Sequence, residues 1–65
     1  MASQNNVDNY MAGAWTALAY MAETGADKSD VESVIVRMSL QISIADEDDL
    51  EILKDAYGED FLTEF

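Results

Sequence analysis

A chain of 65 residues that contains neither Cys nor His has few ways to stabilise a fold. A protein of this size buries only about 60% of the surface that its unfolded chain exposes, so its core alone gives marginal stability. Disulfide bonds and Cys/His zinc sites, which stabilise many small domains, are excluded by the composition. We therefore expect one small domain, residues 1–65, that gains stability from self-association or from binding a partner.

The same missing residue types limit the chemistry open to the chain. Without His it has no side chain whose ordinary pKa lies near neutrality, and without Cys it has no thiolate nucleophile. Ser–His and Cys–His catalysis are excluded for this reason. A domain of this size also has little room for a substrate pocket of about 300 Å³ or more. We expect a protein that is not an enzyme and that uses no cofactor.

The spacing of apolar residues predicts a first helix near residues 5–24. One stripe recurs at intervals of four and three, as a helix requires, and consists of Val7, Met11, Ala14, Leu18 and Met21. Further apolar residues widen the stripe, which indicates contact with two neighbours. Gly13 lowers helix stability by about 1 kcal/mol relative to Ala, which favours close packing against another helix over simple tolerance. Gly25 is a typical residue to end the helix.

The second segment allows two interpretations. Ser29 and Glu32 fit a capping box, which predicts a helix near residues 30–45. From Val34 to Ile44, however, apolar and polar residues alternate strictly, which is typical of a strand. No other segment alternates in this way, so such a strand would need a second copy of the chain to pair with. We favour the helix and keep an intermolecular strand over residues 33–45 as the alternative.

The third segment predicts a helix near residues 47–57, with Asp46 as its N-cap and Gly58 at its end. Together the segments predict an all-α fold, a small three-helix domain with a short C-terminal turn or tail. We expect a homodimer through the first two helices. The residues expected to mediate this self-association are Met11, Trp15, Leu18, Ile35 and Met38.

Acidic residues are concentrated at the C-terminal end. Residues 46–65 carry nine acids and one base, whereas residues 1–45 carry five acids and two bases. In a continuous helix these nine charges would lie about 3 Å apart, close to the 3.4 Å spacing along one DNA strand. They can keep a small domain soluble or dock on a basic protein. The partner-binding candidates are Asp46, Glu47, Asp48, Asp49, Glu51, Asp55, Glu59 and Asp60.

Net charge and hydropathy exclude several other partners. A formal charge of −11 argues against direct binding of nucleic acid or anionic lipid, which are themselves polyanions. The apolar stretch from Tyr10 to Ala22 is too short to span a bilayer and lacks the basic flank of a secretory signal, so we expect a cytoplasmic protein. A calcium loop starting at Asp46 fails, because the required Gly and final Glu are replaced by Glu51 and Tyr57. We therefore expect no metal site.

In size, in missing catalytic residue types and in its acidic segment, the chain resembles the small acidic inhibitors of phages and mobile elements, including DNA-mimic and anti-CRISPR proteins. The residues that carry the resemblance are Asp46, Glu47, Asp48, Asp49, Glu51, Asp55, Glu59, Asp60 and Glu64. It implies steric and electrostatic blockade of a basic, nucleic-acid-binding protein without turnover. The alternative is a structural or regulatory homo-oligomerisation module that uses the apolar helix faces around Trp15 and Leu18. A weaker alternative is an obligate subunit that folds only against a larger partner.

Overall fold

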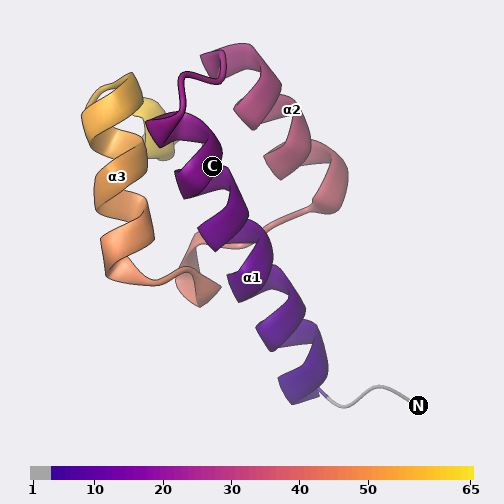
Figure 1. Ribbon diagram of the computed structural model, residues 1–65. Helices are drawn as coiled ribbons and strands as arrows, with labels where there is room; N and C mark the ends of the chain where they lie inside the picture. The colour runs from indigo at the N-terminus through magenta and orange to yellow at the C-terminus, as the bar shows by residue number, and fades with distance from the viewer. Residues whose placement is uncertain (1–3) are drawn as a thin grey trace.

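The computed structural model describes the backbone of residues 4–65 and the side chains of residues 7–63 and 65. Over these residues the chain forms three α-helices and two short 3₁₀ helices, without a strand (Figure 1). The elements in chain order are α1 (Gln4–Glu23), α2 (Lys28–Met38), η1 (Ile42–Ile44), α3 (Glu47–Tyr57) and η2 (Phe61–Glu64). The expectation of a small all-α domain with three helices is confirmed.

The central element is α1, with α3 along one side and α2 on another (Figure 1). Its contact with α3 is the more extensive of the two. The buried core between the elements consists of Trp15, Leu18, Ala22, Val31, Ile35, Leu40, Leu53 and Phe61. Trp15 is 0% exposed, and its indole Nε1–H donates a hydrogen bond to the Gln41 carbonyl at 3.0 Å. A single side chain of α1 therefore fixes the segment that joins α2 to α3.

The second helix differs from the expectation of residues 30–45, because α2 ends at Met38. Ser39 takes a left-handed backbone conformation with φ 52° and ψ 44°. The Leu40 N–H donates to the Ile35 carbonyl at 3.0 Å, and the Ser39 N–H donates to the Val36 carbonyl at 3.2 Å. This is a Schellman motif, in which buried Leu40 packs into the core together with Ile35. Burial of Leu40 provides the physical reason for the early end.

The strand alternative for residues 33–45 is not observed either. Residues 33–38 are helical, Ser39 is the left-handed turn residue, and residues 40 and 41 form a short link to η1. The alternation does report burial in this link, because Leu40 is buried and Ile42 is half-buried whereas Gln41 and Ser43 are exposed. The expected capping box is also absent, since α2 begins at Lys28 with Asp27 as its N-cap and no side-chain cap hydrogen bond.

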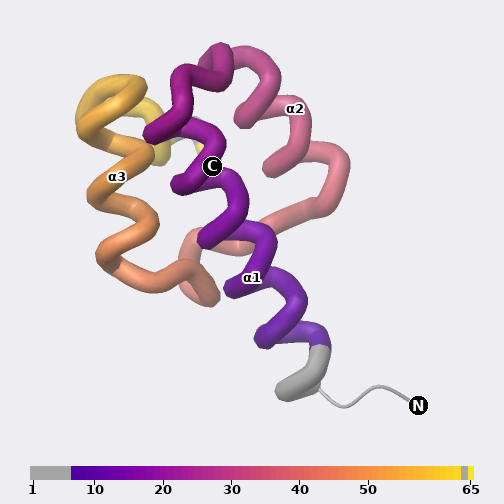
Figure 2. Tube along the Cα trace, viewed as in Figure 1, coloured from indigo at the N-terminus to yellow at the C-terminus, as the bar shows by residue number. Residues whose placement is uncertain are grey.

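The first helix extends well beyond the rest of the molecule. It has 20 residues, about 30 Å of helix, whereas α2 and α3 have 11 residues each, about 17 Å. The first described turn of α1, residues 7–10, therefore projects from the body (Figure 2), and the molecule measures 37 × 22 × 22 Å. A short helix without tertiary contacts is marginal in water, so α1 is stabilised through its packed part, which includes Met11, Trp15 and Leu18.

The C-terminal segment folds back on the core as η2. Phe61 is buried, and its ring centroid lies 5.0 Å from that of Tyr57 and 5.6 Å from that of Phe65. Lys28 Nζ lies 5.9 Å from the Phe61 ring centroid, within the range of a cation–π contact. The expected C-terminal turn is thus a docked part of the domain. Within the described residues no helix has the length and apolar character needed to cross a membrane.

Candidate protein-binding surface

The outer side of α3 carries a group of exposed carboxylates, which we call the acidic face. It consists of Glu47, Asp48, Glu51 and Asp55, all of them exposed. At about 100° per residue, the four positions fall within an arc of about 100° around the helix axis. Leu53, on the opposite side of α3, is 0% exposed and holds the helix on the core. Amphipathic packing of α3 therefore turns the carboxylates to solvent as one group.

The acidic face contains repulsive neighbours. Glu47 and Glu51, and again Glu51 and Asp55, stand four positions apart, a spacing at which like charges destabilise a helix by about 0.2–0.5 kcal/mol per pair. Glu47 and Asp48 offset part of this cost, because they lie in the first turn where the helix dipole favours anions. Lys54 Nζ forms an ion pair with Glu51 Oε2 at 3.8 Å, with the Lys54 side chain 32% and the Glu51 side chain 67% exposed. Such a pair contributes at most about 1 kcal/mol, so the face stays strongly negative.

The structure separates Asp49 from the acidic face, although the sequence grouped them. Asp49 is half-buried, and the Thr16 hydroxyl lies 2.7 Å from its Oδ2. The same hydroxyl is 3.2 Å from the Ala12 carbonyl, but it has only one proton and the closer carboxylate is the stronger acceptor. Asp49 therefore joins α3 to α1.

The other predicted partner-binding residues lie at the two ends of α3. Asp46 is the exposed N-cap, again without a side-chain cap hydrogen bond. Glu59 and Asp60 are exposed and follow Gly58 in the turn that leads to η2. They continue the negative surface beyond the helix without sharing its regular spacing. The structure thus brings four of the eight predicted residues together on one helix arc.

The residues expected to mediate self-association lie mostly in the core. Trp15, Leu18 and Ile35 are at most 2% exposed, so in the single chain they are covered by its own elements. Met11 and Met38 are half-buried at the margin of the core. These side chains are buried because α2 and α3 pack on two sides of α1 and cover its most hydrophobic stripe.

A different surface of α1 is exposed, apolar and uncharged. Tyr10 is 66% exposed and Tyr20 is 68% exposed, and Gly13 and Ala17 between them are also exposed. Beside these residues runs a groove of about 520 Å³ between α1 and α2. The described residues that line the groove are uncharged, and they are Asn9, Tyr10, Gly13, Ala14, Ala17, Leu18, Met21, Val34 and Met38. The residues predicted for self-association did not include Tyr10, Gly13, Ala17 or Tyr20, although the absence of charge from Asn9 to Ala22 was a signal for this side of the helix.

Tyr57 joins the end of α3 to the α1–α2 loop. Its hydroxyl donates a hydrogen bond to the Ala26 carbonyl at 2.6 Å. Burial raises the pKa of the Tyr57 hydroxyl, and the negative charges of Asp27 and Asp30 raise it further. The group therefore serves as a neutral donor in the fold.

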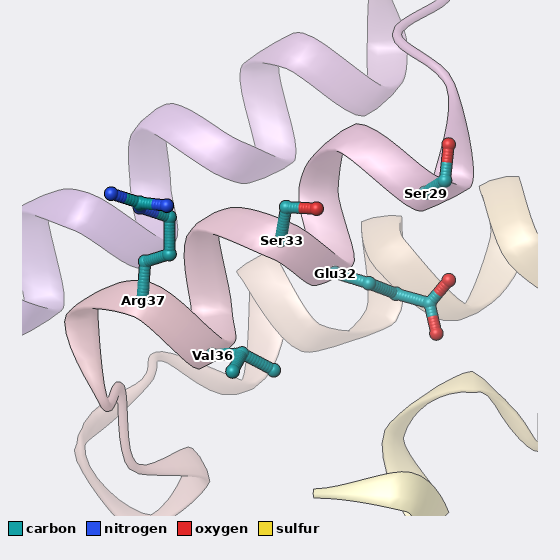
Figure 3. A pocket seen from close by; sticks show the side chains of 5 residues that line it. All are labelled: Ser29, Glu32, Ser33, Val36 and Arg37. Carbon is teal, nitrogen blue, oxygen red and sulfur yellow. The ribbon is translucent and has the colours of Figure 1, made fainter.

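The outer side of α2 has a shallow hollow whose side chains do not converge. It is lined by Ser29, Glu32, Ser33, Val36 and Arg37, and in Figure 3 the Glu32 carboxylate and the Arg37 guanidinium point in different directions. The described part of the chain also contains no group of three acidic, His or Cys side chains placed to hold a metal ion. The acidic face and the uncharged face of α1 are therefore the two surfaces with a distinctive chemistry.

Comparisons of the chain with protein-family models, with curated proteins and with solved structures gave no match in any of the three.

Proposed function

We propose that this protein acts without catalysis, by docking the acidic face of α3 on a basic surface of another protein. The observation that carries the proposal is the placement of four exposed carboxylates on one arc of a helix whose opposite side is held in the core. The repulsion within this group destabilises α3, so the clustering works against the fold. A basic partner would relieve the repulsion on binding.

The spacing of the carboxylates favours a partner that normally binds nucleic acid. From Glu47 to Asp55 the helix rises about 12 Å, so four charges lie about 4 Å apart along the axis, against 3.4 Å per phosphate on one DNA strand. A groove lined with Lys and Arg for a phosphate backbone would meet a similar line of negative charge. Binding there would exclude the nucleic acid, which is the action of an inhibitor and agrees with the resemblance to small acidic phage inhibitors.

Electrostatic docking predicts a characteristic rate behaviour. Charges at the rim of an interface mainly accelerate encounter, and salt screens them. We therefore expect association with the partner to slow as NaCl is raised, with a smaller change in dissociation. The net charge of −11 contributes to this effect from the whole chain, so a test must separate the acidic face from the total charge.

The test uses two variants with the same net charge. One neutralises the acidic face with Glu47→Gln, Asp48→Asn, Glu51→Gln and Asp55→Asn; the matched control carries Glu23→Gln, Asp27→Asn, Asp30→Asn and Glu32→Gln. Each changes the charge from −11 to −7. The immobilised wild type is used to capture the partner from a cell lysate, with elution by a salt gradient, and the purified partner is then tested against all three chains. We expect association to slow by about tenfold more for the acidic-face variant than for the control.

Two outcomes would contradict the proposal. Equal slowing in both variants would mean that total charge alone matters and that the acids serve solubility. A captured partner whose binding is insensitive to salt and to the acidic-face variant would place the interface elsewhere on the chain. Competition by duplex DNA for the captured partner is the further result expected if the partner's basic surface binds nucleic acid.

A further inference from the structure

The exposed face of α1 has an arrangement that fits a copy of itself. Four exposed residues follow one another along it in the order large, small, small, large, and they are Tyr10, Gly13, Ala17 and Tyr20. These positions are symmetric about residue 15, so reversing the helix direction leaves the order unchanged. Two such faces related by a two-fold axis place small residues against small ones and tyrosines beside tyrosines, an arrangement open to an isologous dimer.

From this symmetry we propose that a second copy of this chain packs on the exposed face of α1, with the two α1 helices antiparallel. In this register Tyr10 of one copy lies opposite Tyr20 of the other, and Gly13 lies opposite Ala17. The small residues let the two helix axes approach closely at the crossing point, and the tyrosines pack over its flanks. The interface belongs to a surface separate from the acidic face and does not depend on the function proposed for that face.

The charge pattern of α1 favours a second copy over a basic partner. The chain carries −11 overall, yet no charged residue occurs between Asp8 and Glu23, so α1 offers a face without charged side chains of its own. A basic partner would find no carboxylate there to pair with. Two like-charged copies, in contrast, can approach along this face with the least repulsion, since α3, which carries the acidic face, packs on another side of α1 (Figure 1).

Gly13 is free of any role in the packing of the single chain. A β-carbon built at Gly13 would meet no atom within 4 Å, so the described structure has open space where a side chain would stand. The neighbouring groove between α1 and α2, about 520 Å³, is likewise open and apolar. A second α1 lying on Gly13 and Ala17 accounts for both features, because its flanking side chains would enter the groove.

The expected dimer is modest in strength. Two tyrosines that are two-thirds exposed, with the small residues and the groove margin, can bury roughly 500–600 Å² per chain, at the lower end of specific interfaces. Repulsion between two chains of −11 weakens it further at low salt. We therefore expect a micromolar dissociation constant that falls as NaCl is raised, the opposite of the salt response expected at the acidic face.

The first test is sedimentation velocity of the full chain from about 1 to 500 μM, with two variants. Gly13→Leu places a side chain at the crossing point in space that is open in the single chain, and Ser33→Leu adds the same side chain on the outer side of α2 as a matched control. The sedimenting mass of the wild type and of Ser33→Leu should rise from 7.2 kDa toward twice that value as the concentration is raised. The dimer dissociation constant of Gly13→Leu should be about tenfold higher or more. Circular dichroism at low concentration should show that Gly13→Leu is folded, because Leu favours helix over Gly.

The second test determines the direction of the helices. A nitroxide spin label at Glu23→Cys is unique, since the chain has no cysteine. An antiparallel pair puts the two labelled positions about 25 Å apart, from 16 residues of helix rise and one interhelical spacing, whereas a parallel pair puts them about 10 Å apart. A 7.2 kDa wild type at every concentration, an undiminished Gly13→Leu dimer, or the shorter label distance would each overturn the proposal.

Discussion

Replacing Ser39 by Gly should stabilise the protein, because Ser39 has a positive φ of 52° at the end of α2. An L-residue in the left-handed region costs about 1–2 kcal/mol, a penalty that Gly does not carry. Gly also increases the conformational entropy of the unfolded chain, which lowers the free energy of unfolding by about 0.4–1 kcal/mol. The difference is a gain of about 0.5–1 kcal/mol in the free energy of unfolding, or about 3–6 °C in Tm for a domain of this size.

The matched control is Ser33→Gly, the same substitution at an exposed position in the interior of α2. There the backbone is right-handed and Gly lowers helix propensity, so we expect a loss of about 0.5 kcal/mol. Urea and thermal unfolding followed by circular dichroism and by Trp15 fluorescence would measure both variants. A decrease in stability for Ser39→Gly similar to that of Ser33→Gly would mean that the helix continues through residue 39, and the account of the α2 end would be wrong.

Three further predictions concern the contacts between elements and the charge of the chain. Tyr57→Phe removes the hydrogen bond to the Ala26 carbonyl and should lower the free energy of unfolding by about 1 kcal/mol. Because the folded-state pKa of Tyr57 is raised, the hydroxyl contributes fully to the free energy of unfolding below about pH 10, and this contribution is lost as the pH rises from there through the folded pKa. In alkaline unfolding curves the free energy of unfolding should therefore decline less for Tyr57→Phe than for the wild type. Thr16→Val breaks the bond to Asp49 and should cost about 1 kcal/mol, with no added loss in the double variant with Asp49→Asn if the two groups act together. Raising NaCl from about 0.05 to 0.5 M should raise the Tm of the wild type, and less so that of the acidic-face variant, because salt screens the repulsion.

The two proposed surfaces respond to salt in opposite directions, which makes them separable in one series of experiments. Docking through the acidic face should weaken with NaCl, whereas pairing through α1 should strengthen. Gly13→Leu leaves every carboxylate in place, and the acidic-face variant leaves the exposed face of α1 intact. Loss of one interaction without the other would show that the surfaces act independently.

Local sequence signals correctly predicted where α1 and α3 begin and end to within one residue. The apolar stripe of α1 and the Gly at position 25, which has φ 97°, mark the extent of that helix. Asp46 and Gly58 bracket α3. These features act within a few residues through hydrogen bonds at the helix ends and through side-chain periodicity, so they can be read from the chain itself. The strong negative charge of the C-terminal third is likewise a property of the sequence.

Only the tertiary structure determines which distant residues contact one another. No Gly, Asn or Pro near Ser39 in the sequence marks a helix end. The end is favoured because Leu40 enters the core and Trp15, more than 20 positions away, donates a hydrogen bond to the Gln41 carbonyl. In the sequence Asp49 cannot be distinguished from its acidic neighbours, because its contact with the Thr16 hydroxyl forms only when α1 and α3 pack together. Trp15 is buried because α2 and α3 pack on two sides of α1, and this packing leaves Tyr10 and Tyr20 at the surface. Periodicity gives each helix a face, but which face is covered depends on how several helices share one small core.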